Sequence, residues 1–233
     1  MSRDRIAMVV GVGGGLGAAL GRRFAAAGMK LALVARGDAV TQPLAEEIDG
    51  TAYRADTTDE AAVNGLFDRV SGDLGEPDLV AFNAGAFQRT SILDATAEDF
   101  DRSWRVSCYG GFLVGRAAAR GMAARGSGTI VFTSATAALR GGAGFVNLAV
   151  GKFGLRALAQ SMARELGPKG VHIANIIIDG LINGPSHAAM TDDIAAGKLL
   201  DPNAIAETYY QIHIQDRTAW TLELDLRPAV EKF

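Results

Sequence analysis

Residues 6–17 read IAMVVGVGGGLG, an apolar run that leads directly into a glycine-rich turn. Five consecutive apolar residues suit a strand that is buried on both faces of a parallel sheet. The next stretch, residues 18–28, carries Leu20 and Phe24 at helical spacing, and Gly28 suits a helix C-terminus. A strand, a glycine turn and a helix in this order predict the opening unit of a dinucleotide-binding fold, in which glycines and free N–H groups receive a pyrophosphate.

The spacing of the glycines is more informative than their number. The common G-x-G-x-x-G fingerprint needs a glycine at position 16, where this chain has Leu16. The pattern G-x-x-x-G-x-G fits instead, at Gly11, Gly15 and Gly17. For this segment taken alone, a tight turn that binds no ligand is the alternative interpretation.

Length, charge and cysteine content narrow the class of protein. The 233 residues predict a single α/β domain over residues 1–233. The net charge of −3 gives no reason to expect nucleic acid or an anionic membrane as a partner. The single cysteine, Cys108, excludes an intrachain disulfide and favours a cytoplasmic location, and no apolar run is long enough to span a bilayer. We expect no metal site, and a small-molecule substrate that the sequence does not name.

Strand-like and helix-like segments alternate along the rest of the chain. Further strands are expected at residues 30–35, 52–55, 78–82, 128–134, 171–178 and 220–226. Helices are expected at residues 39–48, 60–74, 97–125, 144–166 and 202–211. Residues 179–201 are glycine-rich and irregular, and they follow a strand end, where open α/β sheets bind ligands. We interpret this segment as a substrate lid.

The end of the second strand bears on the choice of dinucleotide. An acidic residue there binds the ribose of NAD, whereas an arginine can hold the 2′-phosphate of NADP. The residue here is Arg36, which favours NADP(H) over NAD(H). A solvated loop arginine is one alternative, and Asp38 is placed to reach the ribose in its stead.

A second motif, Asn83-Ala84-Gly85, follows the fourth strand. Together with the glycine spacing at residues 11–17, it resembles the short-chain dehydrogenase/reductase family. The resemblance implies a Rossmann-like, doubly wound parallel seven-stranded sheet with helices on both faces. In that family Asn83 can brace the sheet by backbone hydrogen bonds, and an Asp at the position of Asp56 meets the adenine amino group. Capping of a helix N-terminus is the alternative role for Asp56 and Thr57. The cofactor contacts implied by the resemblance are Gly11, Gly15, Leu16, Gly17, Arg36, Asp56, Thr57, Asn83, Ala84, Gly85, Lys152 and Ile182.

The catalytic half of the family pattern is different here. The family uses Tyr as acid/base in Y-x-x-x-K, a Ser thirteen residues earlier, and an Asn in the preceding long helix. The family's Lys binds the nicotinamide ribose and matches Lys152; aligned on it, the Tyr position is Leu148 and the Ser position is Ala135. Ser107 stands at the Asn position. The family's P-G-x-x-x-T segment is DGLING at residues 179–184, without its Pro and Thr.

No slipped alignment restores the tyrosine. The chain has Tyr53, Tyr109, Tyr209 and Tyr210, and none has a lysine four residues later. Positioned acid–base groups contribute on the order of 10²- to 10⁴-fold to a rate, so ordinary ketone reduction is expected to be severely impaired. Candidate replacements are Ser107 holding a water, Thr133 on the same strand face as Ala135, and His187 in the lid.

Two functions stay open. One is an NADP-dependent oxidoreductase with an altered acid, or one that acts on an activated substrate needing none. The other is a non-catalytic NADP(H)-binding protein, either a redox sensor or a partner subunit; a structural oligomer without cofactor is a third, weaker option. Small residues along the helices expected at 97–125 and 144–166, and the apolar strand expected at 220–226, predict a homodimer or homotetramer.

Overall fold

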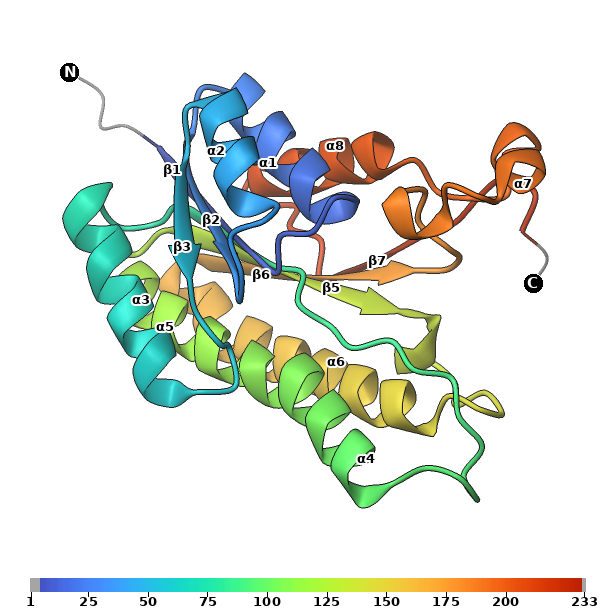
Figure 1. Cartoon of the computed structure of the whole chain (residues 1–233). Coiled ribbons are helices and arrows are strands. Elements are labelled where there is room, and N and C mark those ends of the chain that lie inside the picture. The colour runs from blue at the N-terminus through green and yellow to red at the C-terminus, as the bar shows by residue number, and fades with distance from the viewer. Residues whose placement is uncertain (1–4, 232–233) are drawn as a thin grey trace.

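The computed structural model describes residues 5–231 and places seven parallel strands in one sheet, in the order β3-β2-β1-β4-β5-β6-β7 (Figure 1). The strands are β1 Ile6–Val10, β2 Lys30–Ala35, β3 Thr51–Arg54, β4 Leu79–Phe82, β5 Gly128–Ala135, β6 Val171–Ile178 and β7 Glu223–Leu226. The order reverses between β1 and β4, so the fold is doubly wound as predicted. The carboxyl ends of these two strands form the switch point at which such sheets bind ligands.

Helices cover both faces of the sheet, which makes three layers (Figure 1). One face carries α1 Leu16–Ala26, α2 Thr41–Ile48 and α8 Pro202–His213, and the other carries α3 Glu60–Asp73, α4 Ala97–Trp104, α5 Gly110–Arg125 and α6 Val146–Leu166. Each face has its own hydrophobic core, because side chains alternate along each strand. Val9 packs on the α1 side and Met8 on the α5 side, and both are completely buried. Within residues 5–231, no helix has the length and apolar character needed to cross a membrane.

The helix expected over residues 97–125 is interrupted. A π-helical turn at Arg105–Tyr109, η1, separates α4 from α5. Such a turn fits one extra residue into the helical path, and π-bulges are frequent at functional sites. Hydrophobic periodicity does not register a single inserted residue, so the sequence predicted one continuous helix.

The last strand is also shorter than expected. The strand that pairs with β6 is Glu223–Leu226, whereas Trp220 stacks on the His172 ring with centroids 4.7 Å apart. The segment 179–201 is more ordered than the irregular loop expected. It contains a 3-10 turn η4 at Pro185–His187, a short helix α7 at Thr191–Ala195 and a bridge between Ile182 and Leu200. Two further 3-10 turns, η2 Thr136–Ala138 and η3 Gly167–Lys169, follow β5 and α6.

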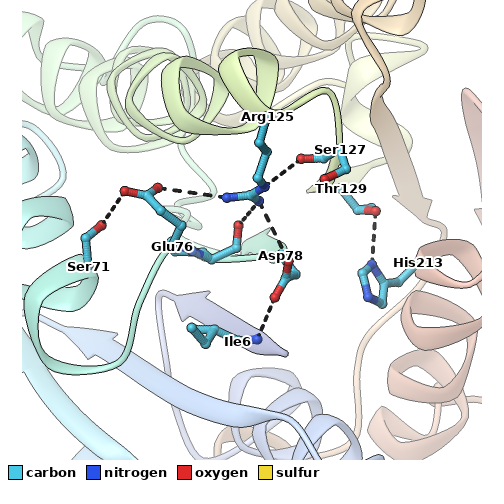
Figure 2. A network of polar contacts seen from close by, with 9 residues as sticks. Ile6, Ser71, Glu76, Asp78, Arg125, Ser127, Thr129 and His213 are labelled. Atoms are coloured by element: carbon cyan, nitrogen blue, oxygen red, sulfur yellow. Dashed lines mark hydrogen bonds and ion pairs between the residues drawn. The ribbon is translucent and has the colours of Figure 1, made fainter. Parts of the chain in front are cut away.

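A polar network ties the elements together at the amino-terminal end of the sheet, away from the switch point (Figure 2). The Asp78 carboxylate accepts the backbone N–H of Ile6 at 2.9 Å, and the Arg125 guanidinium lies 4.0 Å from Asp78. Nearby, the imidazole of His213 lies 3.0 Å from the Thr129 hydroxyl. These contacts link β1, β5, α5 and α8. They lie at the end of the sheet opposite the carboxyl ends of the strands, where a ligand site is expected.

Candidate functional site

The glycine turn between β1 and α1 depends on glycine at two positions. Gly11 has a φ of +90°, and a Cβ there would lie 2.4 Å from the backbone nitrogen of Ala84. A Cβ on Gly17 would lie 2.8 Å from the Cα of Val12. Residues with side chains would push these segments apart. The turn therefore presses directly against the Asn83-Ala84-Gly85 motif.

Asn83 makes the hydrogen bonds to the backbone that were expected of it, and one of them joins the glycine turn to the second motif. Its backbone N–H donates to the Val10 carbonyl at 2.7 Å, and its side-chain Nδ2 donates to the Gly11 carbonyl at 3.0 Å. The side chain thus braces the glycine turn as well as the sheet. Beside it lies a first cavity of about 420 Å³ at the switch point.

The first cavity collects most of the predicted cofactor residues. It is lined by Gly11, Arg36, Asp56, Thr57, Asn83, Ala84 and Gly85 among others. Arg36 is exposed at the end of β2. The N–H and hydroxyl of Thr58 hold the pKa of Asp56 below its usual value, and Arg36 and Arg105 add to the effect. Asp56 does not cap α3, because Asp59 is the capping residue.

The shape and chemistry of this cavity fit a dinucleotide. A Cβ added to Gly13 would meet no atom within 4 Å, so open space faces the turn at the start of α1. Unpaired N–H groups and the positive dipole end at a helix N-terminus favour a phosphate there. An exposed guanidinium is available at Arg36 for a further anionic group.

Lys152 lies on α6 beside the same motif. Its side chain is 6% exposed, its Nζ donates to the Thr133 carbonyl at 2.7 Å, and a Cβ on Gly85 would lie 3.4 Å from Nζ. Burial lowers the pKa of Lys152 to about 8. The ammonium therefore lies next to Gly85, which lines the first cavity, while Lys152 itself is not among the residues that line either cavity.

A second cavity of about 1020 Å³ adjoins the first and shares Gly13 and Asn83 with it. Ala135 at the end of β5 and Leu148 on α6 both line it. The predicted residues Gly15, Leu16, Ile182 and His187 also line this second cavity rather than the first. A Cβ on Gly14 would lie 3.0 Å from the Pro185 ring, so the 179–201 segment rests on the glycine turn.

Ser107 is not among the residues that line either cavity. It lies in η1, is fully buried, and its hydroxyl has no hydrogen-bond partner among residues 5–231. A Cβ on Gly151 would lie 3.4 Å from the Ser107 hydroxyl, so this group faces the helix that carries Lys152. A buried hydroxyl without a partner is a suitable place for an internal water.

The other two candidate acids, Thr133 and His187, differ in whether they line the second cavity. The Thr133 hydroxyl is buried and bonded to the Tyr209 hydroxyl at 2.8 Å, so the expectation that it faces the substrate is wrong. Tyr209 contacts β5 from α8, and no local sequence pattern predicts this contact. His187 lies in the wall of the second cavity, with Nδ1 3.0 Å from the Ile182 carbonyl.

Two features of the second cavity escaped the sequence analysis. Thr136 and Asp179 follow the paired ends of β5 and β6, and the Thr136 hydroxyl donates to Asp179 at 2.6 Å. Phe87 and Phe145 line the same space with ring centroids 6.1 Å apart. The rule that ligands bind beyond the carboxyl ends of strands points to Thr136 and Asp179, whereas the phenylalanines come from loops without a pattern.

Comparison with known proteins identifies the family. The family model described as enoyl-(acyl carrier protein) reductase matches residues 11–223. A (21S)-21-acetoxyl-apo-melianone synthase SDR of Melia azedarach is 33% identical over 190 residues, covering 80% of this chain and 70% of that protein. The chain belongs to the short-chain dehydrogenase/reductase family.

Other members of the short-chain dehydrogenase/reductase family extend the similarity. The 3-oxoacyl-(acyl-carrier-protein) reductase FabG of Escherichia coli is 26% identical over 197 residues, covering 84% of this chain and 80% of that protein. A crystal structure of a short-chain dehydrogenase from Rhodopseudomonas palustris superposes with a TM-score of 0.85 at 37% identity. That alignment covers 97% of this chain and 100% of the other. The chain is therefore an oxidoreductase of this family, and its Rossmann-like fold is confirmed.

Proposed function

We propose that this protein binds NADP(H) in the first cavity and is a short-chain dehydrogenase/reductase whose family Ser and Tyr positions hold Ala135 and Leu148. One observation carries the proposal. Gly11, Gly13 and Asn83 line the first cavity and the Lys152 ammonium lies next to its wall residue Gly85, while the side chains of Ala135 and Leu148 bring no hydroxyl to the adjoining cavity. Cofactor binding is retained and the usual proton donor is replaced by apolar groups.

The chain's own residues have distinct roles toward the dinucleotide. Gly11, Gly15, Leu16 and Gly17 receive the pyrophosphate, and Asp56 and Thr57 lie where the adenine binds. Arg36 pairs with the 2′-phosphate and sets the preference for NADP(H) over NAD(H). Lys152 binds the nicotinamide ribose, with Ala84, Gly85 and Ile182 enclosing the ring. The bound cofactor supplies a hydride donor or acceptor.

The second cavity holds the substrate, and the 179–201 segment closes over it as a lid. Ser107 retains a water beside α6, and His187 is the titratable group that the lid brings to the cavity wall. Neither replaces a tyrosine held against the reacting oxygen. Turnover of simple ketones and alcohols is therefore weak, because negative charge on a substrate oxygen has no organised partner.

A second function is supported by the same apolar positions. A non-catalytic NADP(H)-binding protein, acting as a redox sensor or as a partner subunit, needs the first cavity and Lys152 but no acid. We propose a homodimer or homotetramer in either case. Exposed Phe112 and Phe153 lie on α5 and α6, which suits burial against a second copy.

Calorimetry with NADPH and NADH, followed by turnover of unactivated ketones, tests the proposal. We expect NADPH to bind and ketones to react weakly. The paired change Ala135→Ser with Leu148→Tyr is then expected to raise ketone turnover, because Lys152 already stands one helical turn from the new hydroxyl. Rapid ketone turnover by the unchanged protein, unaffected by His187→Ala and Ser107→Ala, contradicts the proposed site.

A further inference from the structure

A single carboxylate faces the second cavity from its sheet end. Asp179 follows β6 directly, and one of its oxygens accepts the Thr136 hydroxyl at 2.6 Å. Its other oxygen lies 3.5 Å from the Arg227 guanidinium. Each oxygen retains room for a further partner, because an ionised carboxylate offers about four acceptor sites. Asp179 is therefore held in place and can still accept a donor from the cavity.

Asp179, Asp225 and Arg227 form a group of two carboxylates and one guanidinium. Arg227 is shared, since it also pairs with Asp225. One guanidinium thus faces two carboxylates. Three further cations belong to the surroundings of the cavity: Arg89 is exposed beside Phe145, Arg140 is exposed in the lining, and the Lys152 ammonium is buried against Gly85 and the Thr133 carbonyl. Water screens Arg140 more effectively than a mostly buried side chain such as Asp179 is screened.

Aromatic rings complement the carboxylate. Phe87 and Phe145 line the same cavity with centroids 6.1 Å apart, and the remaining wall includes apolar Leu16, Leu148 and Ile182. The exposed Arg89 guanidinium lies 5.5 Å from the centroid of the Phe145 ring, so a cationic ligand would contact this ring beside Arg89 or in its place. Aromatic faces and a carboxylate together recognise organic cations of the quaternary ammonium type. The cavity thus suits an apolar skeleton that carries a delocalised positive charge.

The missing proton donor points to the same kind of molecule. Reduction of a ketone leaves an alkoxide that must receive a proton, and Ala135 and Leu148 cannot supply one. In an iminium cation, the C=N carbon receives the hydride, a C–H bond forms, and the π electron pair moves onto nitrogen. The product is a neutral amine, the cofactor is oxidised, and no proton is transferred.

We propose that Asp179 selects an iminium cation on an apolar skeleton as the substrate that this protein reduces. The inference rests on the proposed function, because the hydride comes from NADPH. Asp179 attracts the cation, Phe87 and Phe145 contact its faces, and the apolar groups at Ala135 and Leu148 pack against the skeleton. The same arrangement disfavours neutral ketones of equal shape, because they have no charge for the Asp179 carboxylate to attract.

Binding is tested first with a cation that cannot be reduced, the N,N-dimethyl tetrahydroisoquinolinium ion, by calorimetry. We expect Asp179→Asn to weaken its binding by about tenfold or more, because the isosteric amide keeps an acceptor for Thr136 but removes the charge. Phe145→Leu keeps an apolar side chain and is expected to weaken binding severalfold. Asp68→Asn, an exposed change on α3, is the matched control and leaves binding unaltered. Equal affinity in Asp179→Asn overturns the inference.

Turnover is then compared for the N-methyl dihydroisoquinolinium cation and the bicyclic ketone tetralone with NADPH. We expect the cation to be reduced at least about tenfold faster per unit concentration, and Asp179→Asn to abolish that preference. A preference for the ketone, or cation binding without reduction, overturns the inference. NADPH affinity is measured separately: failure to bind NADPH overturns the proposed function, whereas intact NADPH binding with Asp179-independent cation binding overturns this inference alone.

Discussion

At the scale of single residues, Arg36 and Lys152 are the two cations to which we assign cofactor binding. Arg36 is exposed in the wall of the first cavity, whereas Lys152 is buried between Gly85 and β5. An exposed charge costs little to maintain, and a buried one lowers stability until a ligand compensates it. Replacement of Lys152 is therefore expected to change the free energy of unfolding, whereas replacement of Arg36 is expected to leave it nearly unchanged.

Arg36→Ala is expected to weaken NADP(H) binding by roughly 10- to 100-fold, the value of one or two charge-assisted hydrogen bonds. NAD(H) binding should change little, since NAD has no 2′-phosphate. Calorimetry with both cofactors measures the ratio, and Lys169→Ala, an exposed change distant from the cavity, is the control. Retained NADP preference in Arg36→Ala contradicts the role given to this residue.

Lys152→Met is expected to raise the free energy of unfolding by about 1–2 kcal/mol while cofactor binding falls, because the charge is removed from a buried position. The pH dependence identifies the cause. The folded-state pKa is lowered to about 8 from 10.5, so between these values the unfolded state binds more protons. Stability of the unchanged protein therefore rises with pH across this window. Urea unfolding of Lys152→Met should show no such rise.

At the scale of elements, the π-helical turn η1 is packed against α6 through glycines. A Cβ on Gly151 would lie 2.9 Å from the Cβ of Ser107, and one on Gly154 would lie 2.6 Å from the Cys108 sulfur. The two elements approach closely because these positions have no side chains. This contact supports the helix that positions Lys152.

Gly151→Ala is expected to destabilise the protein by about 1–3 kcal/mol through overpacking against Ser107. Adding Ser107→Gly removes the clashing Cβ and should restore part of the loss. Thermal unfolding of the single and double variants measures the coupling. If both changes are simply additive, the contact between η1 and α6 is not the cause.

At the scale of the whole molecule, we expect acid stability to depend on His213, which lies in the polar network at the amino-terminal end of the sheet (Figure 2). Burial, with smaller effects from Arg5 and His172, lowers the pKa of His213 to about 4 from 6.5, and Asp78 opposes the shift. Between these values the unfolded state binds the proton more readily, so stability falls as pH decreases from 6.5 to 4. The contribution of this group is about 3 kcal/mol. His213→Gln should flatten this part of the urea-unfolding profile; an unchanged slope assigns the acid sensitivity to other groups.

Assembly is the second prediction at this scale. Phe112, Val150 and Phe153 are exposed on α5 and α6, and a second copy would bury them. We expect light scattering at micromolar concentration to give two or four times the chain mass of 24.3 kDa. Phe153→Glu should reduce that mass, whereas Ile214→Glu, an exposed position after α8, should not. A single-chain mass for the unchanged protein contradicts the proposal.

The sequence alone determined the fold and the groups around the first cavity, because these depend on short segments with a local physical requirement. Gly11 needs a positive φ and close approach, and Asn83 follows its strand at the switch point. Buried strands read as apolar runs, so the parallel sheet was predictable before its order was known. The roles of these residues toward a cofactor stay predictions.

Only the tertiary structure decided which side chains that are distant in the sequence contact one another. The register of β5 on β6 brings Thr136 next to Asp179. The packing of α8 on the sheet places the Tyr209 hydroxyl within hydrogen-bond distance of the Thr133 hydroxyl. Neither pairing has a sequence pattern, since the partners lie 43 and 76 residues apart. The π-helical turn likewise brings Ser107 against Gly151, 44 residues further along the chain. Local patterns specify backbone shape, whereas long-range packing determines which side chains face the cavity.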